Sequence, residues 1–103
     1  MTTVRDYRGR AVRLTDERRA HILEGAEMGG MERVIEETMR NPQLVISSRS
    51  DTKATMNYRY YYGTHVGDKW LCVVIKYGDE DAFVLTAYLT DAPKKGERIW
   101  PSE

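Results

Sequence analysis

The chain has 103 residues, 31% of them charged and 41% hydrophobic, and a formal net charge of zero; this predicts one globular domain over residues 1–103 and argues mildly against a large non-specific nucleic-acid footprint. The single cysteine, Cys72, excludes an internal disulfide and a cysteine-rich zinc site. No apolar run approaches the ~20 residues of a membrane span and no signal peptide is visible, so we expect a cytoplasmic protein without membrane contact.

The first forty residues predict helices that follow a basic N-terminal segment. Residues Val4–Leu14 can pair as a strand or hairpin around Gly9. Thr15 is a good N-cap for a helix over Asp16–Met28, which the Gly29-Gly30 pair ends. A second helix is expected over Met31–Arg40, because apolar residues recur there with helical spacing: Met31, Val34, Ile35, Thr38 and Met39.

After Pro42 the pattern changes to period two, which is typical of strands. Strands are expected over Gln43–Ser48 and Ala54–Tyr62, then in a hairpin over Trp70–Asp91, with a short closing edge over Glu97–Trp100. This order predicts an α+β fold in which two N-terminal helices pack on one face of a four- to five-stranded antiparallel meander sheet. The opposite face should be partly open, because no segment remains to cover it.

The hairpin over Trp70–Asp91 has two unlike faces. Strict alternation gives one apolar face: Leu71, Val73, Ile75, Tyr77, Phe83, Leu85, Ala87 and Leu89. Opposed residues of an antiparallel pair share a face. The even register that follows is Tyr77 opposite Phe83, Lys76 opposite Val84, Val74 opposite Thr86 and Cys72 opposite Tyr88. The second face therefore offers an ammonium, a hydroxyl and a phenol from Lys76, Thr86 and Tyr88.

No phosphate-binding glycine loop, metal-ligand spacing or serine elbow is present, so no metal or cofactor is expected. The sheet can instead gather polar and aromatic groups: Arg49, Arg59, Lys76, Thr86, Tyr88 and the Tyr58–Tyr62 cluster that contains Tyr60. Such a set suits RNA, because bases stack on aromatic planes and cations neutralise phosphate. The plainer alternative is that the strand tyrosines are packing residues and that Lys76 is an edge charge.

His21 is the most obvious titratable candidate. On a helical wheel it lies away from the apolar stripe of Ile22, Leu23 and Ala26. It is therefore either exposed and without a role or turned toward a cleft, and His65 in a predicted loop could serve instead.

Several motifs in order carry a resemblance to a known group of enzymes. These are RRAHILEG, the helix MERVIEETMRNPQLVISSRSD, the strand YRYYYG, and TAYLTD followed by a basic segment and IW. Over about residues 15–101 the chain resembles a phage-associated, barnase-like branch of the barnase, EndoU, colicin and RelE-type ribonuclease superfamily. The resemblance implies helices over an antiparallel sheet and RNA cleavage without metal, often as a toxin that has an antitoxin partner.

The resemblance also implies roles for individual residues. His21 would be the general acid or base, Arg49 would bind phosphate and Lys76 would stabilise transition-state charge. Thr86 and Tyr88 would position phosphate and stack a base or donate a proton. The chain departs from the family's pattern at EGAEMGG (residues 24–30), where many relatives have a second histidine.

The leading hypothesis is a metal-independent endoribonuclease that cleaves RNA by 2′-hydroxyl transesterification, with His21, Lys76, Thr86 and Tyr88 at the catalytic site. Arg49, Arg59 and Tyr60 would bind the RNA. The alternative is a non-catalytic RNA- or protein-binding module of the same fold. A third possibility is a structural protein that dimerises through an open sheet face or edge.

Overall fold

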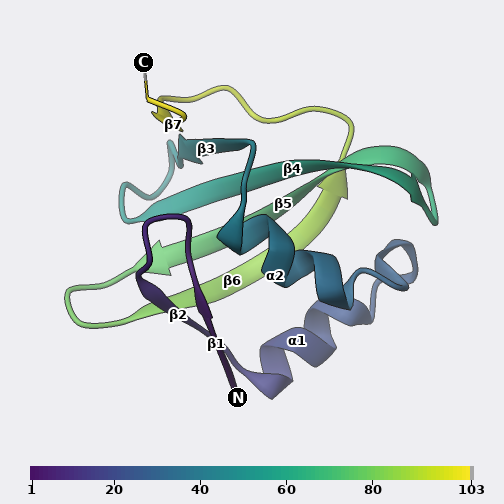
Figure 1. Ribbon diagram of the computed structural model, residues 1–103, viewed down its shortest axis with the longest axis horizontal. Coiled ribbons are helices and arrows are strands. Elements are labelled where there is room, and N and C mark those ends of the chain that lie inside the picture. The colour runs from purple at the N-terminus through teal and green to yellow at the C-terminus, as the bar shows by residue number, and fades with distance from the viewer. Residues whose placement is uncertain (103) are drawn as a thin grey trace.

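The computed structural model describes residues 1–102 and contains a seven-stranded mixed sheet with its helices on one face (Figure 1). The strands are β1 (Thr2–Arg5), β2 (Ala11–Leu14), β3 (Leu44–Ser47), β4 (Ala54–Thr64), β5 (Gly67–Tyr77), β6 (Ala82–Thr90) and β7 (Arg98–Trp100). The helices are α1 (Asp16–Leu23), the 3-10 turn η1 (Ala26–Met28) and α2 (Glu32–Arg40).

The sheet has the order β1-β2-β6-β5-β4-β3-β7, so the predicted four- to five-stranded antiparallel meander is wrong. The N-terminal hairpin β1–β2 adds two strands, and β2 runs parallel to β6 with Arg13 beside Phe83. All other neighbours are antiparallel. A hairpin around Gly9 was expected and is present, but it was not counted in the sheet, because a parallel pairing between distant segments leaves no local sequence pattern.

The tip of the β1–β2 hairpin contacts β5 and β7 through side chains. Gly9 turns it with a φ of 86°, a left-handed conformation that suits glycine. Asp6, which is buried, accepts hydrogen bonds from the amides of Arg8 and Arg10 and from the Tyr77 hydroxyl at 2.7 Å. The Tyr7 ring meets the Trp100 ring of β7 with centroids 5.4 Å apart. The first and last strands in the sheet order are therefore connected through this tip.

The first helix is shorter than predicted. Thr15 caps α1 by accepting a hydrogen bond from the Arg18 amide, as expected. The helix ends at Leu23, and Gly25 is extended (φ −63°, ψ 127°) before the short turn η1. Glycine favours this break because it loses the most conformational freedom in a helix.

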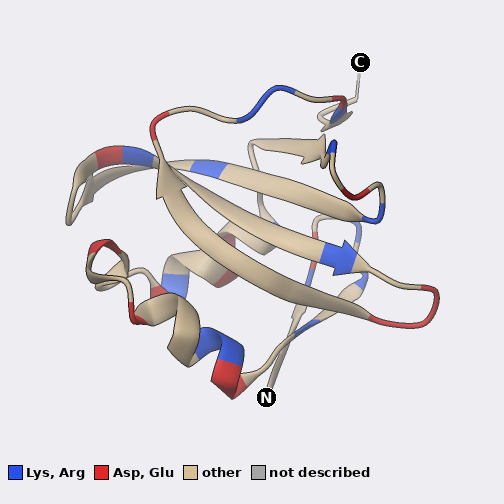
Figure 2. Ribbon diagram, turned by 180° about the vertical axis from the view of Figure 1, so that it is seen from behind, with Lys and Arg blue, Asp and Glu red and all other residues tan. Residues whose placement is uncertain are grey.

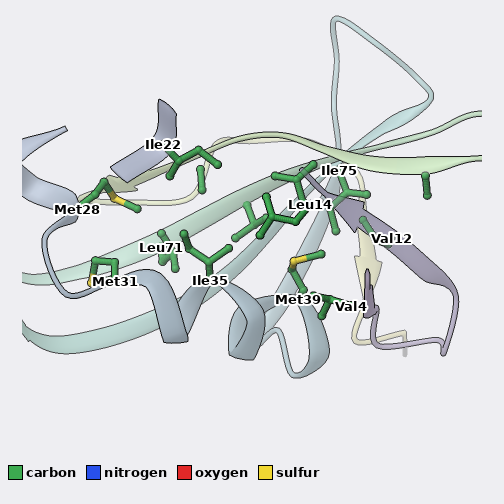
Figure 3. Close-up of a cluster of buried hydrophobic side chains, with 14 residues drawn as sticks. Val4, Val12, Leu14, Ile22, Met28, Met31, Ile35, Met39, Leu71 and Ile75 are labelled. Carbon is green, nitrogen blue, oxygen red and sulfur yellow. The ribbon is translucent and has the colours of Figure 1, made fainter. Parts of the chain in front are cut away.

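The main core lies between the helices and the sheet (Figure 3). Ile35 and Met39 of α2, with Met31 just before it, are buried, which confirms the helical spacing. They pack with Leu71, Val73 and Ile75 of β5 and with Val4, Val12 and Leu14 of the N-terminal hairpin. The core therefore requires the first fourteen residues as well as the central strands.

The β5–β6 register follows the prediction only in the half that lies away from the β5–β6 turn. Val74 lies opposite Thr86 and Cys72 opposite Tyr88, as predicted. A β-bulge then shifts the pairing, so that Ile75 lies opposite Val84 and Lys76 opposite Phe83. Because one extra residue reverses the alternation, Val84 is buried in the helix-side core and Phe83 shares a face with Lys76.

Candidate nucleic-acid interface

The sheet face turned away from the helices has a small apolar cluster of its own, and we call it the open face. Ile46, Met56, Tyr58 and Cys72 are buried there. Leu44, Trp70, Val74 and Tyr88 pack against them and are only half-buried. The face is therefore accessible at its margins and buried at its centre.

One segment, residues 91–97, passes over part of the open face on its way from β6 to β7, and we call it the strap. Its Lys94 amide donates a hydrogen bond to the Tyr58 hydroxyl at 3.1 Å. The Ser47 amide of β3 donates to the Glu97 carbonyl at 2.9 Å. A Cβ added to Gly96 would lie 2.6 Å from Cγ2 of Ile46, so only glycine allows the strap to approach β3 so closely.

A basic pocket of about 160 Å³ lies between the strap and the β3–β4 loop. It is lined by Ser48, Arg49, Ser50, Met56, Lys94 and Lys95. The two serine hydroxyls are 3.2 Å apart. Figure 2 shows the basic residues of the strap and of the β3–β4 loop from the side opposite to Figure 1. Guanidinium, ammonium and hydroxyl groups in one hollow are the donors that bind phosphate.

The cations of the basic pocket have no acidic partner among residues 1–102. No salt bridge joins Arg49, Lys94 or Lys95 to a carboxylate within residues 1–102, and the pocket lining contains no Asp or Glu. By contrast, Arg13, Arg19, Arg40, Arg59, Lys69 and Lys76 all form ion pairs. The net charge of the whole chain is zero, but the pocket carries a local excess of positive charge.

Lys76 lies on the open face, but it already forms an ion pair with Asp51. Its Nζ donates a hydrogen bond to Oδ2 of Asp51 at 2.5 Å. This bond, with a further one from the Lys53 amide, holds the pKa of Asp51 below its ordinary value. Asp51 follows Ser50 directly, so the pair also fixes the loop that carries two pocket residues.

Thr86 and Tyr88 of β6 lie on the open face, opposite Val74 and Cys72. Burial, together with the neighbouring Cys72 and Tyr58, raises the pKa of the Tyr88 phenol. Burial likewise raises the pKa of Tyr58 to about 12 and that of the Cys72 thiol above its ordinary value. At neutral pH these groups are protonated, so the two phenols can donate hydrogen bonds and cannot act as bases.

An aromatic row follows β4 and β5 beyond Tyr58, made of Tyr58, Trp70, Tyr60 and Tyr62. The Tyr58–Trp70 centroids are 6.4 Å apart, Tyr60–Trp70 5.2 Å and Tyr60–Tyr62 5.1 Å. Tyr62 is 80% exposed, and Tyr60 and Trp70 are half-buried. The row therefore combines packing residues with rings that solvent can reach.

Two predicted site residues lie apart from the others. His21 is on α1, in a shallow hollow with Thr15, Glu17 and Arg18, and its side chain is 67% exposed. Arg59 alternates with Tyr58 and Tyr60 on β4, and its side chain pairs with Glu37 of α2 and donates to the Asn41 carbonyl. Both therefore lie on the helix side of the sheet, whereas Arg49, Lys76, Thr86, Tyr88 and Tyr60 share the open face.

Sequence reasoning missed several residues of this interface: Ser48, Ser50, Trp70, Lys94 and Lys95. The adjacent lysines after Pro93 were a visible signal. Their place could not be inferred, because it depends on the strap folding back over β4 to reach the outer edge of β3.

Besides the hollow of about 310 Å³ at His21, two larger hollows lie in the helix layer, and some of their polar groups are already paired within the protein. One, of about 530 Å³, lies between α1 and α2, where Arg19 already pairs with Glu32 and Glu36. The other, of about 360 Å³, lies beside the β4–β5 hairpin, where the Tyr61 hydroxyl already bonds the Val34 carbonyl and Glu37.

Comparisons with protein-family models, with curated proteins and with solved structures found no match. The resemblance to the ribonuclease superfamily therefore stays a prediction. No helix within residues 1–102 has the length and apolar character needed to cross a bilayer.

Proposed function

We propose that this protein binds single-stranded RNA on the open face, with a phosphate in the basic pocket and bases against the aromatic row. The observation that carries the proposal is a group of three cations, Arg49, Lys94 and Lys95, on the same face as the row and without acidic partners in the described part of the chain. Backbone phosphates supply most of the affinity of such complexes, and stacking on aromatic rings accepts any base.

Binding is favoured over cleavage because the predicted acid–base residue is far from the phosphate pocket in the fold. His21 is on the helix side of the sheet, and the phenols nearest the pocket are protonated at neutral pH. Transesterification needs a base for the 2′-hydroxyl as well as an acid for the leaving oxygen.

Metal-independent RNA cleavage is the second candidate function. It is supported by Thr86 and Tyr88, which share the open face with the pocket cations. A phenol with a raised pKa could protonate the leaving oxygen, and the cations could stabilise the phosphorane. An antitoxin partner, which the resemblance implies, stays a prediction, as does the cytoplasmic location.

The binding proposal is tested by fluorescence anisotropy with a labelled eight-nucleotide RNA at several salt concentrations. Arg49→Gln and Lys94→Gln should each weaken binding and reduce the magnitude of the slope of log K against log salt by about 0.7, the value for one phosphate contact on a single strand. Arg33→Gln is the matched control, because Arg33 is an exposed arginine of α2 on the helix side. Binding that Arg33→Gln weakens as much as Arg49→Gln would contradict the assignment.

The same samples separate the two candidates when they are incubated with EDTA and resolved on a denaturing gel. Intact RNA with salt-dependent affinity supports the binding module. Cleavage that Tyr88→Phe abolishes supports the second candidate, and cleavage lost only in His21→Ala would show that the acid–base group comes from the helix side after all.

A further inference from the structure

The charge of the basic pocket exceeds the charge of an internal phosphate. Three cations line the pocket, and its lining contains no carboxylate. A phosphodiester within a nucleic-acid chain carries a single negative charge, whereas a phosphate monoester carries about −1.5 to −2 at pH 7 and has three acceptor oxygens. The nearest acid in sequence, Asp51, is hydrogen-bonded to Lys76 and so does not neutralise the pocket.

The pocket is also closed on the side of β3. Gly96 lies against Ile46 and Ser47, and the bond between the Ser47 amide and the Glu97 carbonyl joins strap and strand. No passage for a polymer remains between the strap and β3 at this point. A strand that crosses the open face from the aromatic row therefore meets the pocket at a boundary, where a chain end fits better than a continuing backbone.

The hollow has a size that suits such an end. Its volume of about 160 Å³ is several times the roughly 30 Å³ that one water occupies in the liquid, which leaves room for a tetrahedral phosphate. The Ser48 and Ser50 hydroxyls are hydrogen-bonded to each other at 3.2 Å, which leaves one neutral donor beside the cations. Three cations and one free hydroxyl donor can together satisfy three phosphate oxygens.

We infer that the basic pocket is a subsite for the terminal phosphate monoester of a single-stranded nucleic acid, with the adjoining nucleotides directed along the aromatic row. The inference rests on the proposed function and makes it more specific: the ligand is an end-phosphorylated strand. Either end of a strand can carry this group, and the experiment distinguishes the two.

The test compares one eight-nucleotide RNA in five forms: with free hydroxyl ends, with a 5′-phosphate, with a 3′-phosphate, and with a methyl ester of each phosphate. Methylation keeps the size of the group and removes one negative charge. We expect one phosphorylated form to bind about tenfold more tightly than its methyl ester, in line with one added charge-assisted contact. Arg49→Gln, Lys94→Gln and Lys95→Gln should bring that ratio toward one, and Arg33→Gln should leave it unchanged.

Each outcome has a distinct meaning. No binding of any form would overturn the proposed function and this inference with it. Equal binding of phosphorylated, methylated and hydroxyl ends would overturn the terminal subsite alone. A preference for the phosphorylated end that persists in all three pocket variants would assign the subsite elsewhere. Circular dichroism confirms that each variant is folded, and competition by inorganic phosphate at constant ionic strength provides a measurement on the unmodified protein.

Discussion

Asp51 and Lys76 form the ion pair that anchors the β3–β4 loop beside the basic pocket. The hydrogen bond from Lys76 lowers the pKa of Asp51. A carboxylate whose pKa is lower in the folded state stabilises the fold above its unfolded pKa of about 3.9, and this contribution is lost as pH falls through the folded pKa.

The Asp51→Asn variant should therefore be less stable than the unmodified chain at pH 7, and the difference should disappear below the folded pKa of Asp51. Urea unfolding at pH 7, 5 and 3 measures this. Asp79→Asn, at an exposed aspartate of the β5–β6 turn, is the control and should show no such pH-dependent difference. A difference that does not shrink between pH 5 and pH 3 would mean that Asp51 stabilises the fold through something other than its charge.

Tyr58 connects the sheet to the strap through a single hydroxyl. Tyr58→Phe removes the acceptor of the Lys94 amide and should lower the free energy of unfolding by about 1 kcal/mol, the usual value of one hydrogen bond. Tyr62→Phe is the matched control, because that ring is 80% exposed, and it should change stability by less than about 0.5 kcal/mol. Equal effects in urea unfolding would indicate that the strap is held without Tyr58.

At the scale of elements, the bulge in the β5–β6 ladder decides which residues of β6 reach the core. Strict alternation predicted Phe83 and Leu85 on the core face, but Val84 is 3% exposed and packs there instead. The bulge keeps Thr86 and Tyr88 on the open face while it turns Val84 inward. It therefore changes which alternate residues of β6 reach the core: Ala82 and Val84 on one side of the bulge, Ala87 and Leu89 on the other.

The register can be tested with one substitution at two positions. Val84→Thr places a hydroxyl in the core and should lower the free energy of unfolding by about 1–3 kcal/mol, because the buried hydroxyl gives up its hydrogen bonds to water and gains no partner in the core. Val74→Thr makes the same change on the half-buried open face and should cost less than about 1 kcal/mol. Both residues remain β-branched, so strand propensity is matched. The reverse order in urea unfolding would contradict the bulge.

How far the sequence predicts this fold depends on element length. The nine residues of α2 carry a full apolar stripe, and β4 and β5 have eleven residues each, so their periods are readable. The strands β1, β2 and β7 have three or four residues, and their partners are set by distant contacts. Several strand residues of the candidate site and the loop cation Arg49 were among the predicted residues. Lys94 and Lys95 were missed, since they meet Arg49 only through the path of the strap.

At the scale of the whole molecule, the contact between Tyr7 and Trp100 joins the two ends of the sheet order. Such ring pairs contribute about 0.5–1.5 kcal/mol beyond area burial. The N-terminal hairpin and the C-terminal strand should therefore stabilise each other.

A double-mutant cycle of Tyr7→Ala and Trp100→Ala should give a coupling energy of about 0.5–1.5 kcal/mol in urea unfolding. The control cycle pairs Tyr7→Ala with Tyr62→Ala on the distant β4–β5 hairpin and should be additive within about 0.5 kcal/mol. Additivity in the first cycle would mean that the two rings lie together without stabilising the fold.

The parallel pairing of β2 with β6 also has a consequence for how the chain folds. Because Arg13 of β2 pairs with Phe83 of β6, the ribosome must synthesise most of the chain before the N-terminal hairpin can join the sheet. The antiparallel neighbours β3 to β6 follow one another along the chain and can assemble earlier, since their loops are short. We therefore expect the hairpin to dock late, and the apolar side chains of Val4, Val12 and Leu14 to stay exposed in the nascent protein until it does.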